Sequence, residues 1–210
     1  WLGESNVNYN LGTKWTSTLY DALNRPVSVT FPDGSVLETT YVGNRTTITD
    51  PGGAKWDRYT DGLGRLTSVT EYPGGTTYTT TYVYDALGNL RSVQQGTQRR
   101  YFAYDSLSRL IRASNPEHQA NASLPAYTDP ISGNASWSYD YTYDRRDNLA
   151  QRKDPRNVTT TYVYDTFNRV QSVSYSDGTP TVTHYYDGQG LVSTPVNALG
   201  KRTAVVNSVS

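Results

Sequence analysis

The sequence predicts an all-β protein made of antiparallel β-hairpin repeats, and three observations support this fold class. The chain of 210 residues contains 19 tyrosines and 17 glycines, a composition typical of strands and tight turns. A Tyr-Asp pair followed by turn residues recurs at about 20 residues, or at about twice that spacing. The flanking residues alternate between apolar and polar, as in half-buried strands. We expect the hairpins to coil into a β-solenoid, either as a narrow tube or as an open shell segment.

Each repeat begins with a Tyr-Asp pair that we interpret as structural. A hairpin loop made of a type I turn and a left-handed residue favours Asp in the first place and Gly or Asn in the fourth. Six copies have Asn, Gly or Asp in the fourth place, and Ser108 is the exception. Thr60 replaces the tyrosine in the copy at Asp61. The complete pairs are Tyr20-Asp21, Tyr84-Asp85, Tyr104-Asp105, Tyr143-Asp144, Tyr164-Asp165 and Tyr186-Asp187.

The segments between these turns are predicted strands with one apolar face. Aromatic residues stand one and three positions before the aspartate in four copies, and Leu or Val stands five positions after it, except at Pro26. A second set of turns lies about half a period away. Tight turns at alternating ends give an antiparallel meander. The second set comprises Asp33-Gly34, Asp50-Pro51-Gly52, Gly74-Gly75, Gln95-Gly96, Asp154-Pro155 and Asp177-Gly178.

One domain of about eight hairpin repeats is expected over residues 1–210, with an inserted loop at 114–138. This segment fills a doubled gap between two repeats and is rich in Pro, Asn, Ala and Ser. The alternative is a degenerate repeat in the same place. Tyr127, Trp137 and Tyr139 are candidate ligand-binding residues, because their rings could stack on a sugar. The other interpretation is that these rings hold the insert against the sheet.

Several function classes are excluded or disfavoured by composition. The chain has no cysteine, so disulfides, cysteine-ligated metals and cysteine nucleophiles are excluded. His118 and His184 are the only histidines, and no catalytic or phosphate-binding motif is present. We therefore expect no cofactor, no metal site and no enzymatic activity. Basic and acidic residues number 19 each, and no apolar run reaches 18 residues, so neither nucleic acid binding nor membrane insertion is expected.

The repeat unit resembles the YD repeat, also called the Rhs repeat. The signature is Tyr-Asp-x-x-Gly-Arg followed by Leu-x-x-Val, and it is clearest at residues 84–93 and 164–173. The resemblance covers at least residues 20–192. It implies a β-sheet of hairpins that winds into a shell, similar to the cocoons of toxin complexes and polymorphic Rhs toxins and to the extracellular barrels of teneurins.

The resemblance implies a non-catalytic module that acts as shell, spacer or scaffold of a larger secreted or cell-surface protein. Its expected partners are the rest of the parent polypeptide or an encapsulated cargo. The alternative hypothesis is a carbohydrate-binding or adhesion module, motivated by the Tyr and Trp content and the neutral charge. Edge-to-edge association of copies is a further candidate interaction, because sheet edges carry unpaired backbone groups.

Overall fold

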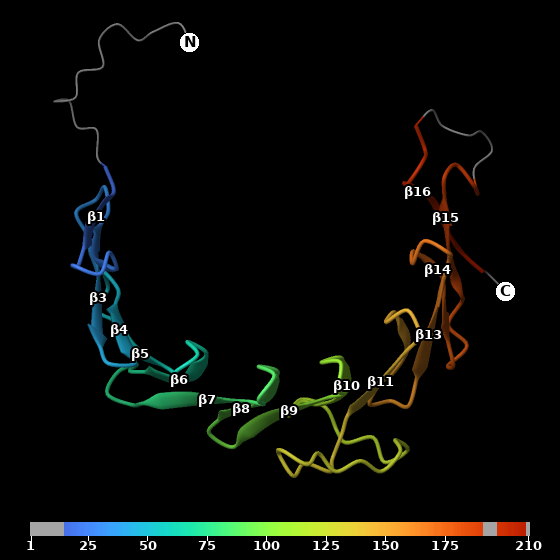
Figure 1. Ribbon diagram of the computed structural model, residues 1–210, viewed down its shortest axis with the longest axis horizontal. Coiled ribbons are helices and arrows are strands. Elements are labelled where there is room, and N and C mark those ends of the chain that lie inside the picture. The colour runs from blue at the N-terminus through green and yellow to red at the C-terminus, as the bar shows by residue number, and fades with distance from the viewer. Residues whose placement is uncertain (1–14, 191–196, 209–210) are drawn as a thin grey trace, which may run out of the picture. The chain divides into compact units, whose positions relative to one another are not determined.

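The computed structural model describes residues 15–190 and 197–208, and these contain β-strands but no helix (Figure 1). Strand order in the sheet follows chain order, and all strand pairs are antiparallel, which confirms the predicted all-β hairpin class. The chain divides into two compact units. Unit 1 comprises Trp1–Tyr82 and Gln94–Thr97, and unit 2 comprises Val83–Val93 and Gln98–Ser210. A single domain over residues 1–210 stays a prediction.

Each strand is short and is followed directly by a turn, as the alternation of apolar and polar residues predicts. The strands that begin in unit 1 are β1 (Ser17–Tyr20), β2 (Pro26–Thr30), β3 (Val36–Val42), β4 (Arg45–Thr49), β5 (Lys55–Thr60), β6 (Leu66–Glu71) and β7 (Tyr78–Tyr84). The others are β8 (Leu90–Gln95), β9 (Gln98–Tyr104), β10 (Leu110–Ser114), β11 (Tyr139–Tyr143), β12 (Leu149–Lys153), β13 (Thr159–Tyr164), β14 (Val170–Tyr175), β15 (Val182–Tyr186) and β16 (Arg202–Asn207). Residues 115–138, between β10 and β11, contain no strand.

The Tyr-Asp turns have the predicted geometry of a short loop with a left-handed residue and a β-bulge. At the first turn, the Asp21 N–H donates to the Arg25 carbonyl (2.9 Å) and the Asn24 N–H donates to the Asp21 carbonyl (3.0 Å). The strand register shifts beside the turn, between Leu19 and Tyr20, as it does at the equivalent place in β13. The residue in the fourth place has positive φ in all seven copies: Asn24 (58°), Gly64 (77°), Gly88 (86°), Ser108 (60°), Asp147 (64°), Asn168 (60°) and Gly190 (73°).

Ser108, the one fourth residue of a type without special tolerance for a left-handed backbone, adopts the same conformation as the others, with φ of 60°. The Ser108 N–H donates to the Asp105 carbonyl (3.1 Å), and the Asp105 N–H donates to the Arg109 carbonyl (3.0 Å), as in the other copies. The two bonds that close the loop impose a left-handed backbone on this residue, although serine has no special tolerance for it. The turns of the second set also carry left-handed residues: Gly34, Gly53, Gly74, Gly75, Gly96, Asn157 and Gly178.

The last copy of the repeat departs from the predicted tight hairpin. Its strand, β15, pairs with β16, and the Asp187 N–H donates to the Lys201 carbonyl (3.1 Å). The segment 197–201 carries the turn instead, because Asn197 and Gly200 have φ of 63° and 76°. Its residues, Asn-Ala-Leu-Gly-Lys, match the turn of the other copies except for the missing aspartate. Asp187 contacts this turn from the end of β15, since its Oδ1 accepts the Gly200 N–H (2.7 Å). Residues 191–196 lie outside the described residues.

The described residues enclose little apolar core. The buried apolar residues among them are Ala103, Ala113, Trp137 and Ala198. Several buried residues are polar or charged, among them Asp57, Arg91 and Asp129. Burial of apolar area is therefore small, and the hydrogen bonds and ion pairs between neighbouring repeats have to contribute much of the stability.

The glycines of one turn offer a matched test of the left-handed position. Gly64 has φ of 77°, whereas Gly62, two residues earlier, has no positive φ, and a Cβ at either residue meets no atom within 4 Å. We expect Gly64→Ala to lower the free energy of unfolding by about 1–2 kcal/mol, the cost of placing Cβ in a left-handed backbone. Gly62→Ala is expected to be neutral or slightly stabilising. Equal urea midpoints for the two variants would contradict this account.

Candidate functional site

The most regular polar feature of the chain is a network that we call the Tyr-Asp ladder. It consists of the Tyr and Asp of each repeat and the residue four positions after the Asp. At Asp165, Oδ1 accepts the N–H groups of Phe167 (2.8 Å) and Arg169 (3.0 Å), and Oδ2 accepts Arg169 Nε–H (2.6 Å). The same arrangement occurs at Asp21, Asp61 and Asp105 with Arg25, Arg65 and Arg109, and at Asp85 and Asp144 with Asn89 and Asn148.

These contacts keep the ladder carboxylates ionised. The side-chain hydrogen bond from Arg25 and the backbone bonds that Asp21 accepts hold the pKa of Asp21 below its ordinary value. At Asp165, partial burial raises the pKa, but the hydrogen bonds from Arg169 and Phe167 outweigh it, and the net pKa is lowered. The contacts with Asp187 and Asp165 raise the pKa of Arg169. The carboxylates therefore act as hydrogen-bond acceptors that hold the turns closed.

The ladder tyrosines tie each repeat to the one before it. In unit 2, Tyr164 Oη–H donates to the Leu149 carbonyl (3.0 Å), and the carbonyl belongs to the residue five positions after the preceding repeat's aspartate. In unit 1, Tyr41 makes the equivalent bond to Pro26 (3.0 Å). Tyr41 was missed in the sequence because no aspartate follows it, although it stands one period after Tyr20. Further examples are Tyr143 with Leu110 (3.0 Å) and Tyr186 with Val170 (2.9 Å).

The arginine of one repeat also stacks on the tyrosine ring of the next. The Arg169 guanidinium lies 4.3 Å from the centroid of the Tyr186 ring, and Arg25 lies 4.1 Å from that of Tyr41. Such cation–π contacts stabilise the approach of a guanidinium to an aromatic face. The Arg of the repeat signature could have indicated this role, but its partner lies in the next repeat. Arg109 with Tyr143 (4.9 Å) and Arg91 with Tyr104 (5.7 Å) are further pairs.

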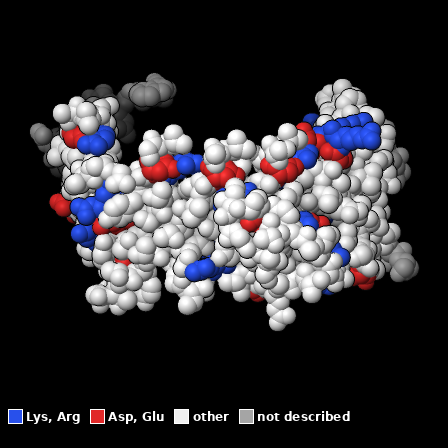
Figure 2. Space-filling model, turned by 60° about the horizontal axis from the view of Figure 1, so that its bottom comes forward, with Lys and Arg blue, Asp and Glu red and all other residues white. Residues whose placement is uncertain are grey.

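Charged groups of the ladder are paired across repeats as well as within turns. Arg169 donates to both carboxylate oxygens of Asp187 (3.2 and 2.8 Å), and Arg109 donates to Asp147 (2.5 Å). Figure 2 accordingly shows acidic and basic side chains side by side at several places on the face in view. Because these groups are engaged with one another, the ladder is suited to joining neighbouring repeats.

A prediction for the ladder concerns the hydroxyl of Tyr164. We expect Tyr164→Phe to lower the free energy of unfolding by about 0.5–1.5 kcal/mol, because the Leu149 carbonyl loses its partner while the ring stays in place. Tyr162→Phe is the matched control, since no hydrogen bond to the Tyr162 hydroxyl occurs among the residues of β12 to β14. Urea denaturation measures both variants. A cost at Tyr162 as large as that at Tyr164 would refute the role of the interrepeat bond.

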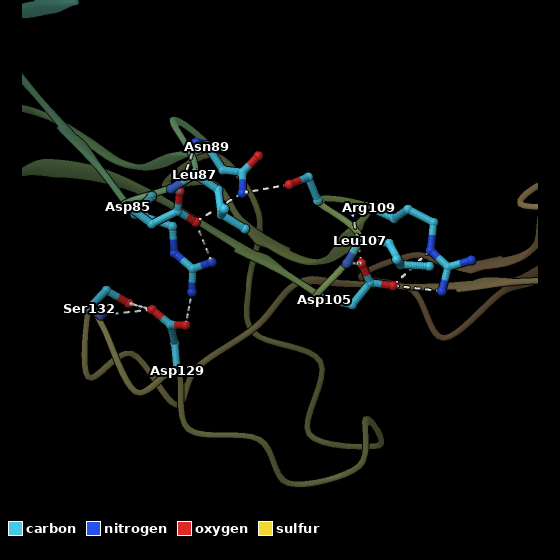
Figure 3. Close-up of polar contacts among 10 residues, drawn as sticks. Asp85, Leu87, Asn89, Asp105, Leu107, Arg109, Asp129 and Ser132 are labelled. Carbon is cyan, nitrogen blue, oxygen red and sulfur yellow. Dashed lines mark hydrogen bonds and ion pairs between the residues drawn. The ribbon is translucent and has the colours of Figure 1, made fainter. Parts of the chain in front are cut away.

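A buried ion-pair network joins the segment 115–138 to the ladder (Figure 3). The Arg91 side chain is 4% exposed and lies between Asp85 (3.5 Å, Nη1 to Oδ2) and Asp129, whose side chain is 0% exposed. The other oxygen of Asp129 accepts the N–H (2.7 Å) and Oγ–H (2.6 Å) of Ser132. Sequence reasoning missed this network, because Arg91 and Asp129 are 38 residues apart and no motif connects them.

Of the three candidate ligand-binding residues, Tyr127 and Trp137 contact each other, whereas Tyr139 contacts His118 and Tyr141. Trp137 is 3% exposed, its Nε1–H donates to the Tyr127 carbonyl (2.8 Å), and the two rings are 6.0 Å apart. Tyr139 lies on β11, where its hydroxyl is 3.3 Å from His118 Nδ1 and its ring stacks on Tyr141. The burial of Trp137 favours a packing role for this ring. Ligand binding by the three residues stays a prediction.

Two negative findings concern the part of the chain that the structure describes. Residues 15–190 and 197–208 contain no group of three or more His, Cys, Asp or Glu side chains placed to hold a metal ion. Within the same residues, no helix is long and apolar enough to span a membrane. His184, the second histidine, lies on β15.

Two family models of this repeat match the sequence. The sequence matches the family model of the teneurin YD-shell over residues 59–206 and that of the RHS repeat over residues 20–55. Comparison with curated proteins gives no match.

Solved structures that resemble the chain include toxin-complex proteins and a porin-like protein. A Photorhabdus luminescens Tc holotoxin pore structure is 16% identical, with a TM-score of 0.35, over 82% of this chain and 13% of that chain. A TcdB2-TccC3 crystal structure is 17% identical, with a TM-score of 0.34, over 91% and 14%. A porin-like protein from Bacteroides uniformis is 15% identical, with a TM-score of 0.33, over 81% and 83%. The chain thus spans only 13% to 14% of the length of the two toxin-complex chains.

Proposed function

Because the chain belongs to the teneurin YD-shell family, we propose that it is a non-catalytic structural segment that forms part of a shell wall in a larger protein. The observation that carries this proposal is the Tyr-Asp ladder. Its tyrosine hydroxyls, aspartates and arginines are used to join successive hairpins, as at Tyr164, Asp165 and Arg169. A wall needs such contacts between neighbours, because a single hairpin cannot bury enough surface to fold alone.

The partners in this proposal are the rest of the parent polypeptide and any cargo that the shell encloses. Among the described residues, β1 pairs only with β2, and β16 pairs only with β15. Each has an edge that further hairpins of the parent protein, or another copy of the chain, can extend by strand pairing. The proposed location is outside the cell, secreted or on the cell surface, as the family resemblance implies.

Proteolysis of the 210-residue chain with a protease of broad specificity tests the wall proposal. We expect slow cleavage of the repeats from β9 to β14, because cleavage requires local opening of the ladder. Asp165→Ala should accelerate cleavage near residues 160–175, since it removes the acceptor of three hydrogen bonds. Asp33→Ala, in a turn outside the ladder, is the matched control. Rapid digestion of the unsubstituted chain, or equal rates for the two variants, would overturn the proposal.

The carbohydrate-binding alternative is tested by calorimetry with a set of glycans on the same chain. The wall proposal expects no heat of binding. Saturable binding that Tyr139→Ala abolishes, and that Tyr78→Ala on β7 leaves unchanged, would favour the binding module instead.

A further inference from the structure

Four Asp-Gly pairs occur in the chain, in or beside its turns. This dipeptide isomerises spontaneously, because glycine has no Cβ and its backbone nitrogen can reach the carboxyl group of the preceding aspartate. The reaction needs a nitrogen that is not held in a hydrogen bond and a carboxyl group that can rotate toward it. The structure gives the pairs different surroundings, so it separates a reactive pair from protected ones. The pairs are Asp33-Gly34, Asp61-Gly62, Asp177-Gly178 and Asp187-Gly188.

The pairs at Asp61 and Asp187 belong to the Tyr-Asp ladder and are held through the carboxylate. Asp61 Oδ1 accepts the Arg65 N–H (3.0 Å), and Asp61 Oδ2 accepts the Arg65 Nε–H (2.7 Å). Both oxygens of Asp187 accept hydrogen bonds from Arg169, and Gly188 is buried. Rotation of either carboxyl group toward the next nitrogen breaks these bonds, so the reaction requires local opening of the ladder.

The pair at Asp33 is held through its nitrogen. The Gly34 N–H donates to the Phe31 carbonyl (2.9 Å), and this bond closes the turn. Asp33 Oδ1 also accepts both the N–H (2.9 Å) and the Oγ–H (2.6 Å) of Ser35. The nitrogen that would attack is therefore engaged, and the turn has to open before it can react.

The pair at Asp177 has neither form of protection. Both of its residues are exposed, and Gly178 has φ of 83°. In residues 15–190 and 197–208, no carbonyl or carboxylate accepts the Gly178 N–H. The Asp177 carboxylate accepts the N–H of the nearby Thr179 (3.0 Å), but it forms no ion pair with any residue in those ranges. Its nitrogen is thus available, and its carboxyl group can rotate without breaking a ladder contact.

We propose that Asp177-Gly178 is a modification site at which the chain converts to isoaspartate. The Gly178 nitrogen forms a bond to Cγ of the protonated Asp177 carboxyl group, and a water molecule leaves to give a succinimide. Water then adds to the main-chain carbonyl of Asp177, and the bond from this carbonyl to the Gly178 nitrogen breaks. The main chain now runs through Cγ, and the mass of the chain is unchanged.

The modification lengthens the turn between β14 and β15, because the Cβ of residue 177 becomes part of the main chain. The register of these strands is set by the pairs Ser172 with Thr183 and Val173 with Val182. We expect the longer connection to weaken this pairing. The inference goes beyond the wall proposal, because it concerns covalent ageing of one turn and does not depend on the parent protein.

Peptide mapping of the 210-residue chain after several weeks at neutral pH and body temperature tests the inference. Electron-transfer fragmentation distinguishes isoaspartate from aspartate at each pair. We expect isoaspartate to form at Asp177 about tenfold or more faster than at any other pair, because the others react only through local opening. In urea, the four pairs should react at similar rates, since glycine follows each aspartate. Equal rates in the folded chain, or a faster reaction at another pair, would overturn the inference.

A variant of the ladder tests the cause of the protection. Arg65→Met removes the clamp on Asp61 Oδ2 and should raise the rate at Asp61 several-fold, while the rate at Asp177 stays unchanged. Arg58→Met, which changes an exposed arginine on β5, is the matched control. An Asp61 rate that Arg65→Met does not alter would contradict protection by the ladder. Circular dichroism shows whether each variant is folded.

Methyl transfer provides an independent measurement. An isoaspartyl methyltransferase with labelled S-adenosylmethionine esterifies the isoaspartyl carboxyl group and leaves ordinary aspartate unmodified. We expect the label to accumulate during ageing of the unsubstituted chain and to be largely lost in Asp177→Glu, in which the longer side chain disfavours ring closure. Equal labelling of the two aged chains would place the modification elsewhere.

Discussion

Replacing Arg91 with methionine is expected to lower the free energy of unfolding by about 3–5 kcal/mol, the typical cost of removing one partner from a buried ion pair. The substitution keeps the length of the side chain but leaves the Asp129 carboxylate, which is 0% exposed, without its cation. The two hydrogen bonds from Ser132 remain and cannot replace the compensating charge. Urea denaturation followed by circular dichroism measures the loss.

Arg156→Met is the control for this result. Arg156 pairs with Asp154, and the Asp154 side chain is only 10% exposed, but the Arg156 side chain is 77% exposed. Asp154 keeps the N–H bonds from Arg156 and Val158 in the variant, so loss of the exposed guanidinium is expected to have a smaller effect. The double substitution Arg91→Met with Asp129→Leu should recover much of the lost stability, because no uncompensated charge then remains at Asp129. An Arg91→Met variant that is as stable as Arg156→Met would show that the buried network does not hold the segment 115–138 in place.

The free energy of unfolding is expected to be level around neutral pH and to fall steeply at acid and at alkaline pH. The ladder aspartates cause the fall at acid pH. The pKa of each carboxyl is lower in the folded chain than its ordinary value of 3.8, so the unfolded chain takes up protons first as pH falls. The stabilisation of the fold by these ionised aspartates is therefore complete above about pH 4, and it is lost as pH drops through the folded-state pKa values. Many groups act together: Asp21, Asp61, Asp85, Asp105, Asp144, Asp165 and Asp187.

The buried tyrosines cause the loss of stability at alkaline pH. Burial raises the pKa of Tyr141, Tyr143 and Tyr164 above 10.0, so the folded chain retains these protons longer than the unfolded chain does. Their contribution is complete below about pH 10 and is lost as pH rises further. Tyrosinate absorbance and urea midpoints, measured across the pH range, follow this transition.

Two variants separate the loss of stability at acid pH from the loss at alkaline pH. Asp165→Asn should reduce the loss of stability at acid pH by the share of one aspartate among the seven and leave the alkaline loss unchanged. Tyr164→Phe should reduce the loss at alkaline pH and leave the acid loss unchanged. Identical pH profiles for both variants and the unsubstituted chain would contradict the assignment of the acid loss to the aspartates and of the alkaline loss to the tyrosines.

The Tyr-Asp pattern is easy to recognise in the sequence, but the hydrogen bonds that it makes between neighbouring repeats are hard to predict. The role of Asp165 as the acceptor for its own turn was within reach of the sequence, since all its partners lie within four residues. The Tyr164 hydroxyl, in contrast, bonds a carbonyl 15 residues earlier. That partner depends on the register between neighbouring hairpins. Trp137 could not be assigned to solvent or interior for the same reason, because its burial depends on how the segment 115–138 folds back.

The sequence by itself determined the all-β class, the meander order and the positions of the turns. These features depend on local chemistry: an aspartate that accepts nearby N–H groups, a fourth residue in a left-handed backbone, and alternation along each strand. Only the tertiary structure decided the Arg91–Asp129 pair, the use of residues 197–201 as the last turn, and the bond from Tyr41 to Pro26. These contacts join residues far apart in the chain, and their energies depend on strand register and burial, which no local pattern records.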